Sequence, residues 1–348
     1  MKTSRWIFVV GVALLLAGGA GWGLLNLPLA PRLQVLSATA PSAPTRVESN
    51  APQATPLPLP PVARVVEVAA PATDNLAAQP QQTNGLCGQT GTQTTLLVGE
   101  GTTVWWGVGA VRMVNVDFDA QTVRVLAFPP DLWVDTPALA AAQITATHPT
   151  TATTLDLVYY AARQLQPGTA RQKMIYATNL VAQTLFDNFE LLPDHYIGVR
   201  QDVFSETVEA LGGLPINIPE SVSDHRFHYP VGSQTLTGEQ ALHYTRLFHD
   251  GEWSRIARQQ LVLRALYTQI RQPATLLKLP DLVREFHRNV ATDFSVRQAL
   301  TLACVLESPD ITIEYLEIGP ELTTPGPDRI LYPRTEEIIQ FLQEVFLD

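Results

Sequence analysis

An apolar run close to the N-terminus constrains this chain more than any other feature. Lys2 and Arg5 precede Trp6 to Leu25, a stretch in which every residue is apolar or small. About twenty such residues in a helix are long enough to cross the hydrocarbon core of a bilayer. Positive charges on the short side favour a cytoplasmic tail at residues 1–5. We therefore predict a transmembrane anchor at residues 6–27, with everything after it exported.

A cleaved signal peptide is the alternative to an anchor. Its apolar centre would be Ile7 to Ala17, and its cleavage site would be the small residues Gly18-Gly19-Ala20. The apolar run continues past Ala20, which favours the anchor. Both interpretations export the protein, so we expect a single-pass protein of the cell membrane with the bulk of its chain extracytoplasmic.

A proline-rich stretch follows the apolar run. Eleven of the 27 prolines fall between Pro28 and Pro80. Because proline fixes φ and has no backbone N–H, such a stretch favours an extended spacer over a long helix or a strand ladder. We predict an extracytoplasmic tether at residues 28–86. Residues 87–348 are enough for one domain with a sizeable core.

Cysteine usage and charge limit the compartment and the partners. The chain has two cysteines, Cys87 and Cys304. Outside the cytoplasm they would be able to pair; the alternative is a free Cys87 and a buried Cys304, and the sequence does not decide between them. The net charge of −10 comes with no basic stripe, which argues against nucleic acid as a partner.

Residue patterns predict an α/β domain. Two β-rich runs, Val111–Phe118 and Thr122–Phe128, are separated by three residues and predict a hairpin. Further strands are expected at Thr94–Val98, Tyr196–Val199, Leu214–Ile218 and Ile311–Ile318. Helices are expected at Leu155–Leu165, Met174–Phe189, Val203–Leu211, Thr237–Arg246, Glu252–Ile270 and Thr335–Phe346. Strands that alternate with helices predict a single layered α-β-α domain with a mixed central sheet.

Several common catalytic motifs are absent from the sequence. It contains no G-x-S-x-G, Walker loop, H-E-x-x-H or C-x-x-C pattern. His225-x-x-His228 beside Asp224 has metal-ligating residue types. The segment is typical of a surface loop and a third ligand is missing, so we disfavour a metal there.

An arginine cluster is the strongest chemical signal. Arg246 ends one predicted helix, and Arg255 and Arg258 lie on one face in the first turns of the next. Cations are unfavourable at a helix N-terminus, so an anion such as phosphate would complete the cluster. The alternative is a solvated basic face whose arginines pair with Asp250 and Glu252.

Four motifs, in this order and at this spacing, resemble the LytR-CpsA-Psr family, whose domains are extracytoplasmic. They are Phe128-Pro-Pro-Asp131, Val208-Glu-Ala-Leu-Gly-Gly213, Leu236-Thr-Gly-Glu-Gln-Ala-Leu-His-Tyr-Thr-Arg246 and Glu252-Trp-Ser-Arg-Ile-Ala-Arg-Gln-Gln260. The resemblance implies a membrane-anchored phosphotransferase that attaches a polyprenyl-pyrophosphate-linked glycopolymer to peptidoglycan or another envelope acceptor.

The resemblance also implies roles for individual residues. Arg246, Arg255, Arg258 and Gln259 would contact the pyrophosphate of the lipid carrier, while Asp131 and Glu252 would hold Mg²⁺. Asp131 and Arg255 would serve catalysis. An apolar cavity for the lipid tail would open beside Arg246.

Some family positions are substituted. Pro130 stands where the family has an arginine, and Phe248 replaces a second one. Gly107 to Ala110 replaces an Arg-x-Asp-Thr segment, and Glu252 replaces an aspartate. A protein catalyses phosphoryl transfer mainly by neutralising the charge of the transition state, so the loss of these charged groups would weaken catalysis. A second hypothesis therefore stays open. In that hypothesis, the protein binds a polyprenyl phosphate or an envelope glycan without turnover.

Overall fold

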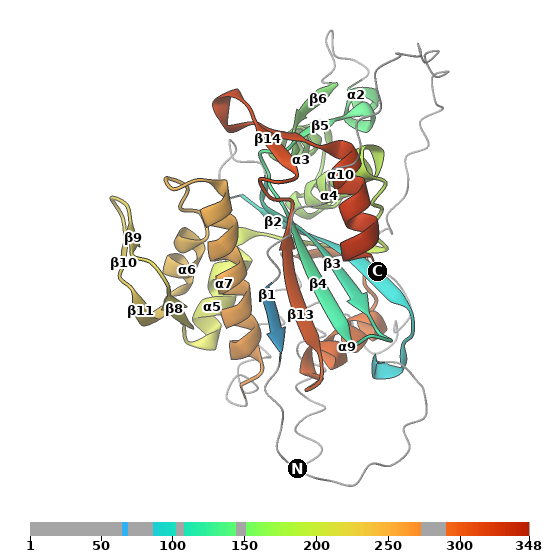
Figure 1. Cartoon of the computed structure of the whole chain (residues 1–348). Coiled ribbons are helices and arrows are strands. Elements are labelled where there is room, and N and C mark those ends of the chain that lie inside the picture. Colours follow the sequence, from blue (N-terminus) through green and yellow to red (C-terminus); the bar gives the residue numbers. More distant parts are fainter. Residues whose placement is uncertain (1–64, 69–85, 102–107, 144–150, 273–289, 348) are drawn as a thin grey trace.

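The computed structural model describes residues 65–68, 86–101, 108–143, 151–272 and 290–347 (Figure 1). The predicted cytoplasmic tail and the anchor at residues 6–27 lie outside these ranges, as does most of the predicted tether. Within the described ranges, no helix combines the length and the apolar character that a membrane crossing needs.

A mixed sheet of seven strands forms the centre of the molecule (Figure 1). Its strands are β1 (Val65–Val68), β2 (Thr92–Glu100), β3 (Val108–Asp117), β4 (Thr122–Phe128), β7 (His195–Val199), β12 (Val290–Thr292) and β13 (Thr312–Glu317). Their spatial order is β1-β13-β4-β3-β2-β7-β12. Only the β13–β4 and β2–β7 pairs of this sheet are parallel. The predicted β3–β4 hairpin and the mixed sheet are both confirmed.

Strand β1 lies within the stretch predicted to be a tether. Val65–Val68 pairs antiparallel with β13, with Val65 opposite Tyr315. The four residues are free of proline, and three of them are valine, which favours extended structure. The sheet therefore includes a strand from before residue 87.

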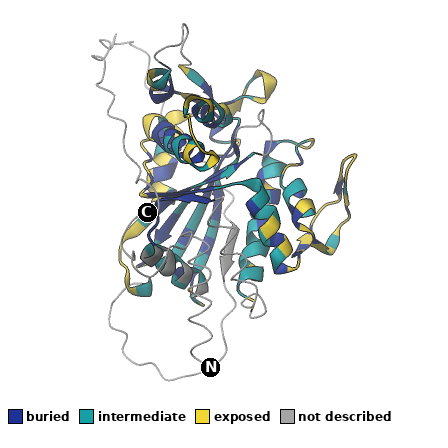
Figure 2. Ribbon diagram, turned by 180° about the vertical axis from the view of Figure 1, so that it is seen from behind, coloured by how far each residue is buried: buried dark blue, intermediate teal, exposed yellow. Residues whose placement is uncertain are grey.

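Helices cover both faces of the sheet, as predicted. One face carries α2 (Pro137–Ala142), α3 (Leu155–Leu165), α4 (Ala170–Phe189) and α10 (Thr335–Phe341). The other face carries α9 (Val296–Glu307) and part of α7 (Glu252–Ile270). Both faces need cover because β3 has apolar side chains on each of them. Val111 and Met113 pack with the helices of the first face, and Val114 and Val116 pack with those of the other face. Figure 2 shows the buried strands between these layers.

A smaller unit beside the sheet has its own apolar core (Figure 1). Its elements are α5 (Gln201–Leu211), β8 (Leu214–Ile218), β9 (Val222–Ser223), β10 (His228–Tyr229), β11 (Gly232–Leu236), α6 (Gly238–Tyr244) and one side of α7. Gly212 and Gly213 end α5 with φ of 87° and 93°. The predicted capping box of Thr237 and Gln240 begins α6, but this helix ends at Tyr244, before Arg246.

Short elements connect these layers. They are η1 (Leu86–Gly88), β5 (Trp133–Asp135), β6 (Ala152–Thr154), β14 (Thr323–Pro325), η3 (Pro327–Arg329), β15 (Leu331–Pro333) and η4 (Leu342–Phe346). Strands β5 and β6 pair with each other, as do β14 and β15. The helix predicted at Thr335–Phe346 is formed by α10 followed directly by η4.

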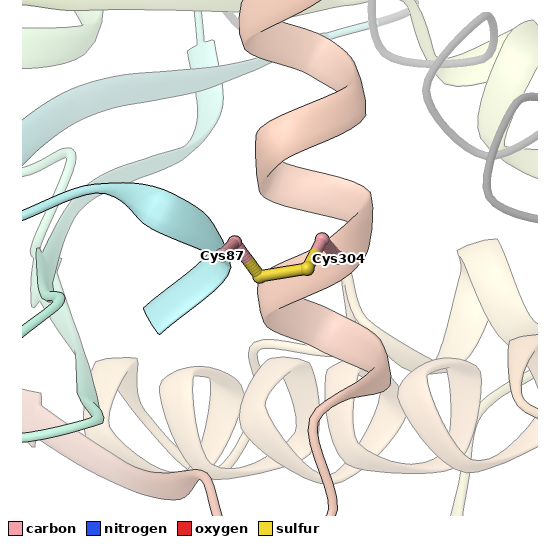
Figure 3. Close-up of a disulfide and its surroundings, with 2 residues drawn as sticks. All are labelled: Cys87 and Cys304. Atoms are coloured by element: carbon pink, nitrogen blue, oxygen red, sulfur yellow. A yellow bond between two sulfur atoms is a disulfide. The ribbon is translucent and has the colours of Figure 1, made fainter. Parts of the chain in front are cut away.

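A disulfide joins Cys87 to Cys304 (Figure 3). Of the two alternatives left open by the sequence, the structure has the paired one. The bond ties η1, at the start of the domain, to α9, with a Cα–Cα distance of 5.9 Å and a sequence separation of 217 residues.

Candidate active site

A cavity of about 380 Å³ lies at the end of the sheet where β4 stops and β3 begins. Its lining residues come from six separate segments: Val108, Pro130, Asp131, Asp156, Phe248, Arg255 and Arg329. Four of the seven are charged, two of each sign. The cavity can therefore hold a polar ligand with both anionic and cation-binding groups.

The Pro-Pro-Asp turn after β4 organises one wall of the cavity. Leu132 N–H donates to the Pro129 carbonyl at 3.1 Å, which closes the turn. Asp156 N–H donates to the Pro130 carbonyl at 3.0 Å and so fixes the start of α3 against it. These bonds bring Asp131 and Asp156 to the same wall, although they are separated in sequence.

Both carboxylates on this wall are destabilised in their charged form. Burial raises the pKa of Asp131, against the opposing charges of Arg255 and Arg329. Burial also raises the pKa of Asp156, and the charge of Asp131 raises it further. A hydrogen bond from the Thr154 hydroxyl partly offsets this. Two mutually repelling carboxylates in a cavity are a place where a cation would be favourable.

Arg255 faces the cavity, and its partner is Glu252. The Arg255 Nε donates to Glu252 Oε2 at 2.8 Å, and Nη2 donates to Oε1 at 2.6 Å. Burial raises the pKa of Glu252, which is only 7% exposed. Both oxygens of Glu252 are thus used by Arg255, so this structure does not present Glu252 as a metal ligand. Nη1 is the edge of Arg255 that Glu252 does not engage.

Arg258 does not line the cavity. It is 7% exposed and donates two hydrogen bonds to Asp250, together with one to the Leu247 carbonyl. Asp250 and Glu252 each neutralise one of these two arginines, so no ligand anion is needed to complete them. For Arg255 and Arg258, the alternative of ion pairs with these two residues is the arrangement that the structure shows.

Arg246 does not line the cavity either. Burial and the charge of Arg226 lower its pKa. The three arginines therefore do not converge on one cavity. The cavity at Arg255 also differs from the apolar one expected for a lipid tail, which stays a prediction.

Gln259 connects α7 to the sheet rather than to the cavity. Its Nε2 donates to the carbonyls of Gly109 at 3.1 Å and Thr245 at 3.2 Å. Its Oε1 accepts a hydrogen bond from Arg112, which lies on β3 and is 2% exposed. Burial lowers the pKa of Arg112 to about 10, while the nearby charge of Glu252 opposes that shift. Every polar atom of the Gln259 side chain is thus used within the fold.

Sequence reasoning missed Arg112, Asp156 and Arg329. An arginine in the apolar run of β3 is a detectable anomaly, since a buried charge requires partners. Asp156 in the first turn of α3 looks like an ordinary helix-start residue. Nothing in the local sequence distinguishes Arg329, which reaches the cavity from η3 and lies over the Phe248 ring at 4.7 Å.

Mg²⁺ was expected from the resemblance. Asp131 and Asp156 offer two carboxylates in one cavity, which fits the small protein ligand set that Mg²⁺ accepts when phosphates and waters complete its coordination. In the described part of the chain, no three or more His, Cys, Asp or Glu side chains are grouped so as to hold a metal. In the His225-x-x-His228 segment, Asp224 lies 3.8 Å from His225 and 3.0 Å from His243.

Comparisons with curated proteins find teichoic acid transferases. The chain is 28% identical over 127 residues to the polyisoprenyl-teichoic acid–peptidoglycan teichoic acid transferase TagU of Oceanobacillus iheyensis, which covers 36% of this chain and 40% of that protein. It is 26% identical over 156 residues to the corresponding TagV of Bacillus subtilis, covering 39% and 40%. The chain thus spans about two fifths of the length of these relatives.

Comparisons with solved structures agree on the fold. The crystal structure of B. subtilis TagV superposes with a TM-score of 0.54 at 20% identity, over 74% of this chain and 97% of that one. The structure of TagT bound to LI-WTA superposes with a TM-score of 0.52 at 17% identity, over 80% and 94%. The model of the LytR_cpsA_psr family matches residues 78–330, which include every residue of the cavity. The chain is therefore a member of the LytR-CpsA-Psr family.

Proposed function

We propose that this protein is a phosphotransferase that attaches a polyprenyl-pyrophosphate-linked glycopolymer to peptidoglycan or another acceptor of the cell envelope. The observation that carries the proposal is the cavity at the end of β4, where Arg255 lies beside Asp131 and Asp156. Guanidinium groups suit phosphate oxygens, and carboxylates suit the divalent cation that accompanies them. The names of the curated relatives support the same chemistry.

Each of these side chains has a role in the proposal. Arg255 contacts the pyrophosphate through the Nη1 edge, while Glu252 holds the guanidinium in place. Asp131 and Asp156 hold Mg²⁺, which neutralises phosphate charge when it is bound. Arg112 and Gln259 keep α7 fixed against β3 and so position Arg255.

The compartment is part of the proposal. A phosphotransferase of this kind acts on the outer side of the membrane, where the lipid carrier meets the envelope acceptor. The disulfide between Cys87 and Cys304 supports an oxidising compartment. We therefore propose that residues 6–27 anchor the protein and that the described domain is extracytoplasmic.

Binding without turnover is the second candidate function, and specific observations favour it. Gly109 occupies the place of a family carboxylate, and the Glu252 carboxylate is occupied by Arg255. A site with fewer free charged groups would still bind a polyprenyl phosphate while stabilising the transition state less.

Hydrolysis of a polyprenyl-pyrophosphate analogue distinguishes the two functions. The full-length protein in detergent is incubated with the analogue, in MgCl₂ or in EDTA, and phosphate release is followed. We expect release that requires Mg²⁺ and that is lost in Arg255→Gln but kept in Asp310→Asn, an exposed control. Binding without release supports the second function, and neither binding nor release contradicts both. Mass spectrometry of co-purified lipid would identify the carrier.

A further inference from the structure

The turn that carries Arg329 has an unusual backbone. Asp328 and Arg329 both have positive φ, 53° and 68°, which is uncommon for residues other than glycine and marks strain. The turn is closed by hydrogen bonds from Gly326 N–H to the Ile330 carbonyl at 2.7 Å and from Ile330 N–H to the Pro327 carbonyl at 3.0 Å. Two consecutive strained residues persist only where the surrounding structure holds them.

The surrounding structure attaches this turn to the cavity. Leu331 N–H donates to the Asp131 carbonyl at 3.0 Å, so the turn is bonded to the segment that carries a cavity carboxylate. Gly326 lies so close to the Tyr332 ring that a Cβ at this position would collide with the ring. The strained backbone is therefore fixed against the cavity wall and delivers Arg329 to it.

Arg329 differs from the other arginines at this end of α7. Arg255 pairs with Glu252, and Arg258 pairs with Asp250. Within the described part of the chain, no carboxylate lies within 4.0 Å of the Arg329 guanidinium. Its contact is the Phe248 ring. Asp131 interacts with Arg329 electrostatically but forms no ion pair with it within 4.0 Å, so the guanidinium is placed to accept an anionic ligand at the cavity.

Phe248 sets the spacing of two guanidinium groups. The central carbon of Arg255 lies 5.2 Å from the Phe248 ring centroid, and that of Arg329 lies 4.7 Å from it. The two groups are therefore at most about 10 Å apart, on the wall of one cavity. A ligand with two linked phosphates can present one phosphoryl group to each of these guanidinium groups.

We propose that Arg329 is the second phosphate-binding residue of the site, and that together with Arg255 it selects a diphosphate over a monophosphate. This inference rests on the proposed function. Arg255 binds one phosphoryl group, and Arg329 binds the other. Phe248, which stands where the family resemblance places an arginine, acts as the platform on which both guanidinium groups lie.

Calorimetric titration of the full-length protein in MgCl₂ tests the proposal, with inorganic pyrophosphate and orthophosphate as probes. We expect the wild type to prefer pyrophosphate by at least about tenfold, a difference that Arg329→Gln reduces to within about threefold. The control is Arg334→Gln, an exposed arginine five residues further on, which should behave as the wild type. Arg329→Lys should keep part of the preference because it keeps the charge without the planar fork.

Three results would overturn the inference. If Arg329→Gln keeps the full preference for pyrophosphate, Arg329 does not bind the second phosphate, and the proposed function is unaffected. If Arg329→Gln loses affinity for both probes equally, with a lower melting temperature, the residue acts through folding. If the wild type binds neither probe, the proposed function fails and this inference fails with it.

Discussion

The Arg258 guanidinium donates hydrogen bonds of 2.5 and 2.7 Å to the two carboxylate oxygens of Asp250, which lies in the turn before α7. These bonds hold the pKa of Asp250 below its usual range. Arg258 also donates to the Leu247 carbonyl and lies over the Tyr244 ring at 5.9 Å. The side chain therefore connects the turn between α6 and α7 to the body of α7, within the fold.

Arg258→Gln should destabilise the protein by about 3 kcal/mol, because it removes a buried charge and leaves Asp250 and the Leu247 carbonyl without their donor. Chemical denaturation measures the free energy of unfolding. Asp250→Asn should lose part of the same energy, and the double variant little more than Arg258→Gln alone. If Arg258→Gln leaves the denaturation midpoint unchanged but loses pyrophosphate binding, Arg258 contacts the ligand and the structural role is wrong.

This prediction reverses what the arginine pattern alone suggests. From the sequence, three arginines on neighbouring helices are expected to repel one another, so that removing charge from Arg258 would preserve or raise stability. The structure shows that Arg255 and Arg258 each lie against a carboxylate from the same short segment. Sequence proximity identified Asp250 and Glu252 as candidate partners. Whether their carboxylates reach the guanidinium groups depends on the conformation of the chain around the start of α7, which the sequence pattern does not give.

Local patterns predicted the elements well for a physical reason. The Thr237–Gln240 capping box and the β3–β4 hairpin depend on residues close in sequence, so their signals are local. Helix α7 has the predicted bounds, Glu252–Ile270. The cavity is different, because its wall joins segments as far apart as Asp131 and Arg329, which meet through a strand bridge and one backbone bond. No periodicity encodes such a contact.

Glu252→Gln tests the metal role that the resemblance implies for this residue. Because both Glu252 oxygens accept hydrogen bonds from Arg255, we expect the Mg²⁺ concentration for half-maximal pyrophosphate binding to change by less than about twofold. Asp131→Asn should raise that concentration by about tenfold or more. Calorimetric titration at several Mg²⁺ concentrations measures both. A tenfold increase in Glu252→Gln would make Glu252 a metal ligand after all.

Asp156→Asn should stabilise the protein at neutral pH by about 0.5–2 kcal/mol, at the expense of Mg²⁺-dependent binding. Asparagine keeps the oxygen that accepts from Thr154 and Leu157 N–H, and it removes a charge that burial and Asp131 disfavour. The measurement is the thermal midpoint, with Asp310→Asn as an exposed control.

The pH dependence of that gain follows from the raised pKa of Asp156. The folded state holds the proton more tightly than the unfolded state, so ionisation costs stability as pH rises above the ordinary value of 3.8 and through the raised value. The advantage of Asp156→Asn should therefore be full at neutral pH and disappear toward pH 3.8 and below. A gain that is equal at all pH values would show that the charge of Asp156 is not its cause.

Replacing both Cys87 and Cys304 by serine should lower the free energy of unfolding by about 2–4 kcal/mol, because the disulfide closes a loop of 217 residues in the unfolded chain. A reducing agent should lower the melting temperature of the wild type and leave that of the double-serine variant unchanged, since the chain has no other cysteine.

The state of the two cysteines in cells tests whether the domain lies outside the cytoplasm. If the domain is extracytoplasmic, a thiol-reactive probe added after denaturation should label neither cysteine unless the sample is first reduced. Labelling of both cysteines without reduction would place the domain in a reducing compartment and would contradict the proposed topology.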